Sequence, residues 1–190
     1  MAKRDKKVIT LGSGEIFIED AAATNAIPTA ATLASWCTDA RKLGEIKGGA
    51  TLGYTANTYK ETDDLGFVAK IITTDENAEL RLGLITWNGD TLKMLIDRCA
   101  VTTDSTNHYR ITKIGGAGNA QGKNYVLVFR HKDPVDGDVY IVIVGKNTAG
   151  ATLAFATTAG TNVEPTFTAI PTPGDANGTL ITMYEQIPAA

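Results

Sequence analysis

Short segments in which apolar and polar residues alternate make up most of the chain, and such alternation is typical of β-strands with one face in a core. Residues 7–19 place Val8, Ile16 and Ile18 on one face, and residues 79–87 alternate three leucines with polar residues or glycine. We therefore expect strands over both segments. Residues 43–54 show the same pattern: Ile46, Ala50, Leu52 and Tyr54 share one face, and Glu45, Lys47, Gly49, Thr51 and Gly53 share the other.

Further strands are predicted along the rest of the chain, separated by turn-forming sequences. The turns GGAGNAQGK, DPVDGD and TTAGTN are rich in residues that tolerate tight or left-handed backbone. Strands repeating every 10 to 14 residues, roughly, are typical of a β-sandwich or barrel. The expected strands are residues 67–74 and 79–87, joined around 75–77, and then 109–114, 125–132, 139–146, 150–157, 163–170 and 178–185.

One segment has the spacing of a helix instead. In residues 88–100 the apolar side chains of Leu92, Leu95, Ile96 and Cys99 fall at i, i+3, i+4 and i+7, which is one face of an α-helix. An asparagine at 88 or an aspartate at 90 could cap its N-terminus. The sequence therefore predicts a mainly β fold, a β-sandwich or barrel with one flanking α-helix.

Two segments fit neither pattern. Residues 20–38 are small and polar until Leu33 and Trp36, and we expect an arm with a helix of one or two turns, which Thr29 could start. Residues 56–65 are polar, and we expect a loop there. The chain thus divides into an N-terminal strand and arm (residues 1–42) and a β-sandwich domain (residues 43–190).

Composition supports a β-rich protein and argues against several functions. Threonine, which favours strands, accounts for 27 of the 190 residues. The net charge of −3 gives no basic excess for a dedicated nucleic-acid binder. Apolar runs are of strand length, and the N-terminus lacks the apolar core of a secretory signal, so we expect no membrane insertion and no export by a cleaved signal. Cys37 and Cys99 are expected as buried free thiols, with a disulfide or a reactive thiol as alternatives.

No group of residues predicts catalysis or metal binding. The glycine-rich residues 115–123 lack the spacing of a phosphate-binding loop, and a strand follows them instead of a helix. Asp133, Asp136 and Asp138 fit a hairpin turn better than a calcium loop. The two histidines, His108 and His131, stand in no zinc motif. We expect that the protein is not an enzyme and needs no cofactor or metal.

The order of segments from residue 43 to residue 187 resembles the major tail tube proteins of long-tailed, siphovirus-like bacteriophages. The resemblance lies in element order and in the phrases KGGATL, LITWNGDTL, FRHKD and GTLITMYE. It implies a tail-tube-like β-sandwich with one helix. It also implies homohexameric rings, in which the inner strands of six copies merge into a β-barrel, and stacking of these rings into a tube through which the genome passes during DNA ejection.

The resemblance also implies partners and a location. The subunit would contact further copies of itself, the tape-measure, tail-terminator and baseplate or tip proteins, and, transiently and without sequence specificity, genomic DNA in the lumen. It would be assembled in the cytoplasm of the bacterial host and reside in the virion tail.

Within that assembly, three groups of residues are expected to form contacts. The polar face of the early strands is expected to line the lumen, with each cation beside a carboxylate so that the wall does not hold DNA; the candidates are Glu45, Lys47, Thr51, Glu79 and Arg81. The polar loop is expected to reach the adjacent ring through Asn57, Thr58, Tyr59, Lys60, Glu61, Thr62, Asp63 and Asp64. Leu33 and Trp36 of the N-terminal arm (residues 20–38) are expected to contact a neighbouring subunit.

Two other functions remain open from the residues. A tube protein of a contractile tail, bacteriocin or secretion system would share the fold and the ring. A carbohydrate- or protein-binding β-sandwich module would share only the fold, and it would not assemble into rings.

Overall fold

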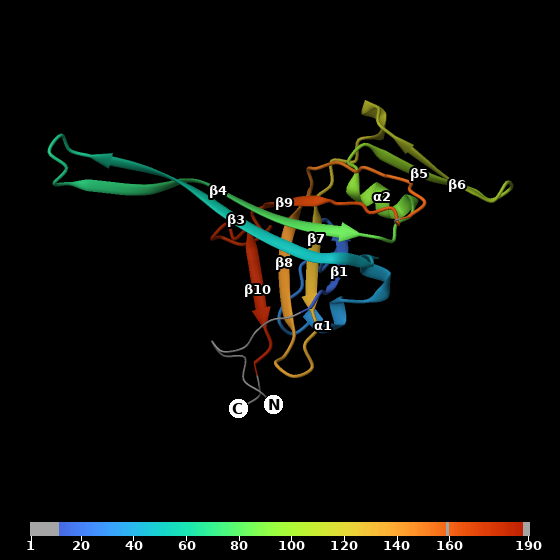
Figure 1. Cartoon of the computed structure of the whole chain (residues 1–190), viewed down its shortest axis with the longest axis horizontal. Coiled ribbons are helices and arrows are strands. Elements are labelled where there is room, and N and C mark those ends of the chain that lie inside the picture. The colour runs from blue at the N-terminus through green and yellow to red at the C-terminus, as the bar shows by residue number, and fades with distance from the viewer. Residues whose placement is uncertain (1–11, 159, 188–190) are drawn as a thin grey trace.

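A computed structural model describes residues 12–158 and 160–187 of the chain, which form a mainly β fold with two short α-helices in these ranges (Figure 1). This confirms the predicted fold class. The strands are β1 (Glu15–Asp20), β2 (Lys42–Gly44), β3 (Ile46–Thr62), β4 (Ala69–Leu84), β5 (Cys99–Asp104), β6 (Tyr109–Ile114), β7 (Tyr125–His131), β8 (Val139–Asn147), β9 (Thr166–Ile170) and β10 (Ile181–Glu185). The α-helices are α1 (Leu33–Trp36) and α2 (Gly89–Leu95), and Asp39–Arg41 and Ala117–Asn119 form 3-10 turns.

Strand β8 joins the two layers of the fold. The main sheet is antiparallel, with the order β2-β1-β7-β8-β9-β4-β3, and β10 also pairs with β8. Residues 139–143 of β8 pair with β10, and residues 144–147 pair with β9. At β9 the sheet folds back on itself. Strand β4 and the base of β3 then form a second layer, which crosses the face formed by β1, β7 and β8 (Figure 1).

The space between the two layers is filled by the apolar faces of the alternating strands. Ile16 and Ile18 of β1 meet Leu80 of β4 and Phe167 of β9 there, and each of the four is at most 3% exposed. The expected face of β1 is thus confirmed for Ile16 and Ile18, while Val8 lies outside the described residues.

The opposite face of β1, β7 and β8 is covered by the N-terminal arm. Phe17, Val126 and Val128 point to this side and pack with Leu33 and Trp36 of α1. Leu33 and Trp36 are each only 4% exposed. The expectation that they contact a neighbouring subunit is corrected: they already have a partner element, the outer face of the chain's own sheet, and are buried against it.

Helix α2 is shorter than its apolar spacing predicts. Asn88 caps it as expected, because its Oδ1 accepts hydrogen bonds from the backbone N–H groups of Asp90 at 2.8 Å and Thr91 at 3.0 Å. The helix ends at Leu95, Ile96 is extended, and Cys99 is the first residue of β5. Cys99 is buried, as expected, but on a strand, because the chain turns after Ile96 to place β5 beside the helix.

Removal of the cap should destabilise the fold by a measurable amount. Asn88→Ala leaves two N–H groups at the start of α2 without their side-chain acceptor. We expect the free energy of unfolding to fall by about 1 kcal/mol, the usual cost of losing an N-cap, in urea titrations. Asn88→Ser, which keeps an acceptor, should lie within about 0.5 kcal/mol of the wild type; equal losses for both variants would contradict a capping role.

Three other predicted segments differ from the structure. Residues 150–157 form no strand, because β9 occupies the edge of β8 next to them. They are irregular instead, and Ala151 and Leu153 pack on the core between the two layers. Residues 67–74 and 79–87 are parts of one continuous strand, β4, which runs through the expected turn at 75–77. The expected loop at 56–65 is strand β3 as far as Thr62.

A group of ion pairs links β1, β2 and β7 at one end of the sheet. The Glu15 carboxylate lies 2.5 Å from Arg130 Nη2, 3.1 Å from Lys132 Nζ and 3.7 Å from Lys42 Nζ. The Arg130 hydrogen bond is the main reason that the pKa of Glu15 lies below its usual value, and Lys132 acts in the same direction. A carboxylate with a lowered folded-state pKa stabilises the fold above its unfolded pKa, and this contribution is lost as pH falls through the folded pKa.

Glu15→Gln should therefore reduce stability only where Glu15 is ionised. We expect a loss of about 1 kcal/mol at pH 7, a modest value because the Glu15 side chain is still 28% exposed. The difference from the wild type should shrink as pH falls below about 4.5, the ordinary value. Denaturant titrations from pH 7 to pH 3 measure it, with Glu45→Gln as the control, since that side chain is 58% exposed; a difference that persists at pH 3 would contradict the assignment.

Candidate interaction surface

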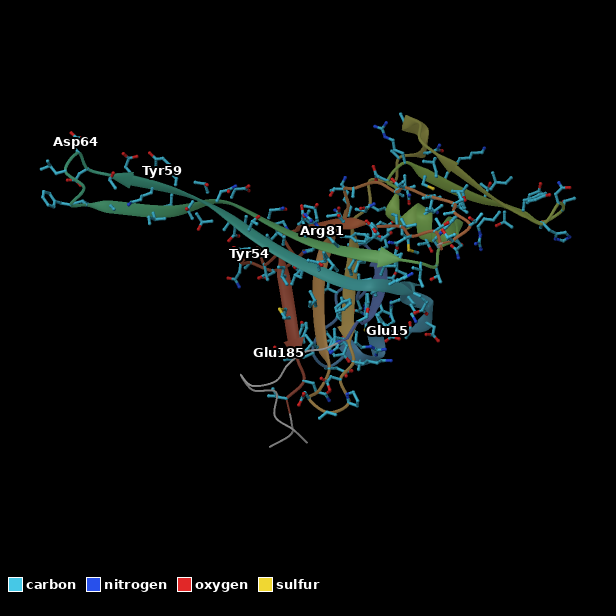
Figure 2. The ribbon with its side chains drawn as sticks, in the orientation of Figure 1. Glu15, Tyr54, Tyr59, Asp64, Arg81 and Glu185 are labelled. Carbon is cyan, nitrogen blue, oxygen red and sulfur yellow. The ribbon has the colours of Figure 1, made fainter. Side chains whose placement is uncertain are left out.

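Strands β3 and β4 form a hairpin that extends far beyond the sandwich (Figures 1 and 2). They pair from Ile46 and Leu84 at the base to Thr62 and Ala69 near the tip. From the base toward the tip, Ala78 is the last fully buried residue of β4, and every residue from 53 to 76 is exposed. We call residues 53–76 the arm, which is distinct from the N-terminal arm of residues 20–38. Both of its faces are open to solvent, so the sandwich does not hold it in place.

Cross-strand contacts explain why these polar residues form strands. Glu61 and Lys70 are directly opposite each other, as are Tyr59 and Ile72, and both kinds of pair favour antiparallel strands. Near the base, the Tyr54 hydroxyl donates a 2.6 Å hydrogen bond to Glu76, which raises the pKa of the tyrosine. Each of these contacts is worth only a few tenths of a kcal/mol to 1 kcal/mol, roughly.

The register of the arm changes at its middle. Asn57 pairs with Asp75 and Thr58 with Thr73, so Thr74 is an extra residue on β4. A bulge of this kind increases the local twist of a strand pair. The two strands cross at this part of the arm in Figure 1, and the outer half is rotated relative to the base.

A tight turn at the end of the arm exposes three apolar side chains. The Asp63 carboxylate accepts a hydrogen bond from Val68 N–H at 2.7 Å, and Gly66 takes the positive φ of 73° that the turn requires. Leu65, Phe67 and Val68 are 76%, 83% and 69% exposed. We call Leu65, Phe67 and Val68 the arm tip. A group of exposed apolar side chains at one place can mark a contact surface for another protein.

The eight residues expected in a polar loop are therefore placed differently by the structure. Six of them, Asn57 to Thr62, are on β3, and only Asp63 and Asp64 belong to the turn. The alternation of apolar and polar residues does not distinguish Leu65, Phe67 and Val68 from a strand end and a loop. An apolar group directly after two aspartates, in an otherwise polar segment, is the signal that could have identified the arm tip.

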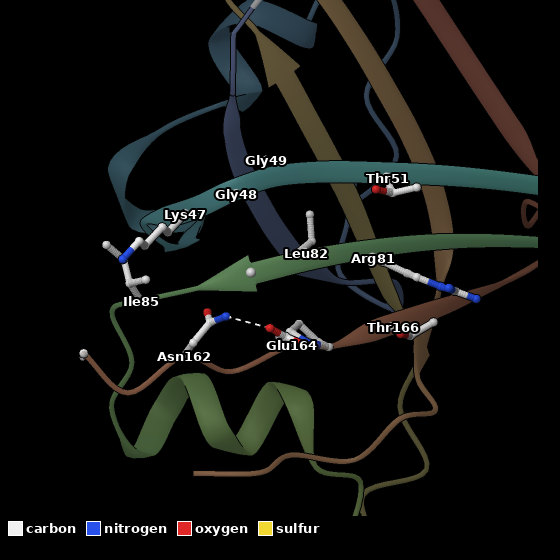
Figure 3. A pocket seen from close by; sticks show the side chains of 13 residues that line it. Lys47, Gly48, Gly49, Thr51, Arg81, Leu82, Ile85, Asn162, Glu164 and Thr166 are labelled. Carbon is white, nitrogen blue, oxygen red and sulfur yellow. Dashed lines mark hydrogen bonds between the residues drawn. The ribbon is translucent and has the colours of Figure 1, made fainter. Parts of the chain in front are cut away.

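The predicted lumen-facing residues are at the base of the same hairpin. Lys47, Thr51 and Arg81 line one open cavity of about 880 Å³ on the side of β3 and β4 away from the core, together with Asn162 and Glu164 (Figure 3). Asn162 donates a 2.8 Å hydrogen bond to Glu164 in this cavity. The alternation predicted for these strands is confirmed, since Leu80 and Leu82 face the core.

The charge pairing at this surface is only partly as expected. Arg81 lies 2.7 Å from Glu79, and this hydrogen bond lowers the pKa of the glutamate. Glu45, however, precedes β3 and binds Lys42 at 2.6 Å, so it does not neutralise Lys47. Lys47 makes no ion pair with any other residue that the structure describes. The carboxylate expected beside Lys47 is thus held by Lys42, although Lys47 lines the same cavity as Thr51 and Arg81.

The described residues contain no group of metal ligands, no disulfide and no membrane-spanning helix. Among residues 12–158 and 160–187, no three His, Cys, Asp or Glu side chains form a group that could hold a metal ion. Cys37 and Cys99 are both free cysteines, as expected, but only Cys99 is buried and Cys37 is half-buried. Desolvation raises the pKa of both thiols. No helix in these ranges has both the length and the apolar character needed to cross a bilayer.

Comparison of the sequence with protein-family models gives no match, and a search among curated proteins finds no significant similarity either.

Proposed function

We propose that the protein is a structural subunit that assembles with copies of itself into hexameric rings, which stack into a tube. In this proposal it is the major tail tube protein of a long-tailed bacteriophage. The observation that carries the proposal is the arm. A two-stranded hairpin exposed on both faces is marginally stable in water, and exposed apolar groups mark protein contacts. A second copy that packs against the arm supplies the burial that the sandwich does not.

The sheet order supports assembly through strand pairing. Strand β3 is the last strand of the main sheet, and within residues 12–158 and 160–187 its 17 residues pair on one side only, with β4. A long unpaired edge invites pairing with another chain. In a ring, the base of β3 would pair with a strand of the next subunit, and closure of the ring would cover this edge in every copy.

The polar side of the β3–β4 base suits a channel wall. In the proposed ring this side faces the lumen, with Thr51 neutral, Arg81 paired to Glu79 and Lys47 as the one cation of the cavity without an ion pair among the described residues. Such a wall attracts the phosphates of DNA less than a row of free cations would. In this assembly the location is the virion tail, and the partners beyond the ring are the tape-measure, terminator and tip proteins.

Electron microscopy of the purified full chain tests the proposal. We expect rings with six-fold symmetry, or tubes, in negative-stain images, and a mass of six subunits or more by light scattering. A monomer at every concentration up to the solubility limit would contradict the proposal and favour a β-sandwich binding module. A contractile-type tube would give the same particles, and a sheath gene beside this one would identify it.

A further inference from the structure

A second hairpin projects from the sandwich at the opposite end of the molecule from the arm. Strands β5 and β6 form this two-stranded sheet, and Figure 1 shows it beyond α2, at the other end of the long axis. One of its faces lies on α2: Cys99 is 1% exposed there, and Arg110 Nη2 is 3.2 Å from Asp90. The helix therefore fixes the direction in which this hairpin points.

The other face of β5 and β6 has no cover from the described chain. Alternation along β6 places Tyr109, Ile111 and Lys113 on this side, opposite Asp104, Thr102 and Ala100 of β5. Tyr109 is 68% exposed and Ile111 is 41% exposed. We call Tyr109, Ile111 and Lys113 the β6 outer row. Tyrosine is enriched at the centre of protein interfaces, and here an exposed isoleucine lies on the same face.

The turn at the end of this hairpin is ordered by its own hydrogen bonds. The Asp104 carboxylate accepts from the backbone N–H groups of Thr106 and Asn107, each at 3.0 Å, and from the Asn107 side chain at 2.9 Å. These bonds, above all that from the Asn107 side chain, lower the pKa of Asp104. The hydrogen bonds fix the turn next to the β6 outer row, and order present before binding reduces the entropy lost when a partner binds.

The two projecting hairpins have opposite charges. The arm carries five acidic and two basic side chains, a net charge of −3. Residues 99–114 carry one acidic and two basic side chains, a net charge of +1. Arg110 is paired with Asp90 and Asp104 is held in the turn, so Lys113 is the cation that this hairpin presents. Lys113 belongs to the outer row, whereas Asp64 lies beside the apolar side chains of the arm tip. Attraction between the hairpins would orient them as they meet.

We propose that the β6 outer row is the docking surface for the arm tip of a second copy of this chain. The inference rests on the proposed function and adds to it the place where the arm binds. The two surfaces differ and lie at opposite ends of one chain, so the contact joins copies head to tail. A head-to-tail contact repeats without closing into a pair, and repetition of this kind extends a stack of rings.

Cross-linking between two variant preparations tests the contact directly. One carries Val68→Cys in the arm tip and the other Ile111→Cys in the outer row, and they are mixed under assembly conditions with a short bismaleimide reagent. We expect a covalent dimer of the two variants in the mixture. Neither preparation alone, nor the wild type with its two native cysteines, should give it. In the control, Val135→Cys takes the place of Ile111→Cys. Val135 is exposed in a turn between β7 and β8, away from the outer row.

A matched pair of charged substitutions tests what the contact does. Tyr109→Asp and Val135→Asp each place a carboxylate at a position that is 68% exposed, so they affect folding alike. We expect Tyr109→Asp to raise the protein concentration needed for tubes by about tenfold or more, while rings persist. Val135→Asp should leave that concentration unchanged.

The outcomes separate this inference from the proposed function. A cross-link confined to the Val68 and Ile111 pair, with stacking lost only in Tyr109→Asp, supports both. Wild-type tubes without that cross-link, or normal stacking of Tyr109→Asp, overturn the docking surface and leave the tube subunit standing. A wild-type protein that stays monomeric overturns both.

Discussion

Replacement of residues 57–75 by an Asn-Gly turn is expected to abolish tube formation and leave a folded protein. Ala56 and Glu76 are directly opposite each other, so a two-residue turn of this kind can close the shortened hairpin. The removed residues contact only one another and solvent. The free energy of unfolding should therefore change by less than about 1 kcal/mol. Urea titrations measure that change, and electron microscopy at matched concentrations measures tube formation.

A second variant shows which part of the arm matters. Serine at positions 65, 67 and 68 keeps the length and pairing of the hairpin but removes the exposed apolar groups of Leu65, Phe67 and Val68. This variant should also fail to form tubes if burial of the arm tip drives stacking. Normal tubes from the shortened chain would show that the arm has no part in assembly.

Phe167→Ala is expected to lower the free energy of unfolding by about 3 to 5 kcal/mol. Phe167 is fully buried and lies between β4, where it pairs with Leu80, and β8, where it pairs with Asn147. Its ring fills the space at which the sheet turns from one layer into the other. Truncation to alanine would leave a cavity that the strands on both sides cannot close. Denaturant titrations monitored by tryptophan fluorescence measure the loss.

Phe155→Ala provides the matched control. The same side chain is removed, but Phe155 is 77% exposed and touches Trp87 only edge to face, with the ring centroids 6.2 Å apart. We expect a change below about 1 kcal/mol. Equal losses for the two phenylalanine variants would contradict the role of position 167 in joining the layers.

The alternation of the core strands was enough to predict most of the sandwich. The core between the two layers contains the residues that the spacing indicates: Leu80 and Leu82 of β4, and Ile16 and Ile18 of β1. Burial of one face is what produces an alternating pattern. The arm gives no such signal, because neither of its faces is buried. Its strands are held by cross-strand pairs such as Glu61 with Lys70, and the register of those pairs is not visible in a single segment.

Competition between elements explains the other differences. The spacing of Cys99 from Leu92 places it on the apolar face of the predicted helix. The helix ends before it, however, and Cys99 is the first residue of β5. Residues 151, 153 and 155 alternate like a strand, but β9 holds the adjoining edge of β8. Leu33 and Trp36 were expected at a subunit contact because no local partner is apparent in the sequence. The partner is the outer face of β1 and β7, which long-range pairing brings to them.

The pairing of β1 with β7 sets the order in which the protein can fold during its synthesis. Glu15 and Arg130 are 115 residues apart, and a ribosome adds roughly 5 to 20 residues per second. About 6 to 23 s therefore pass between synthesis of the first strand and synthesis of its partner. Throughout this interval β1 can pair only with the three-residue strand β2. The β3–β4 hairpin, whose strands are near neighbours in the chain, is complete before the sandwich that carries it.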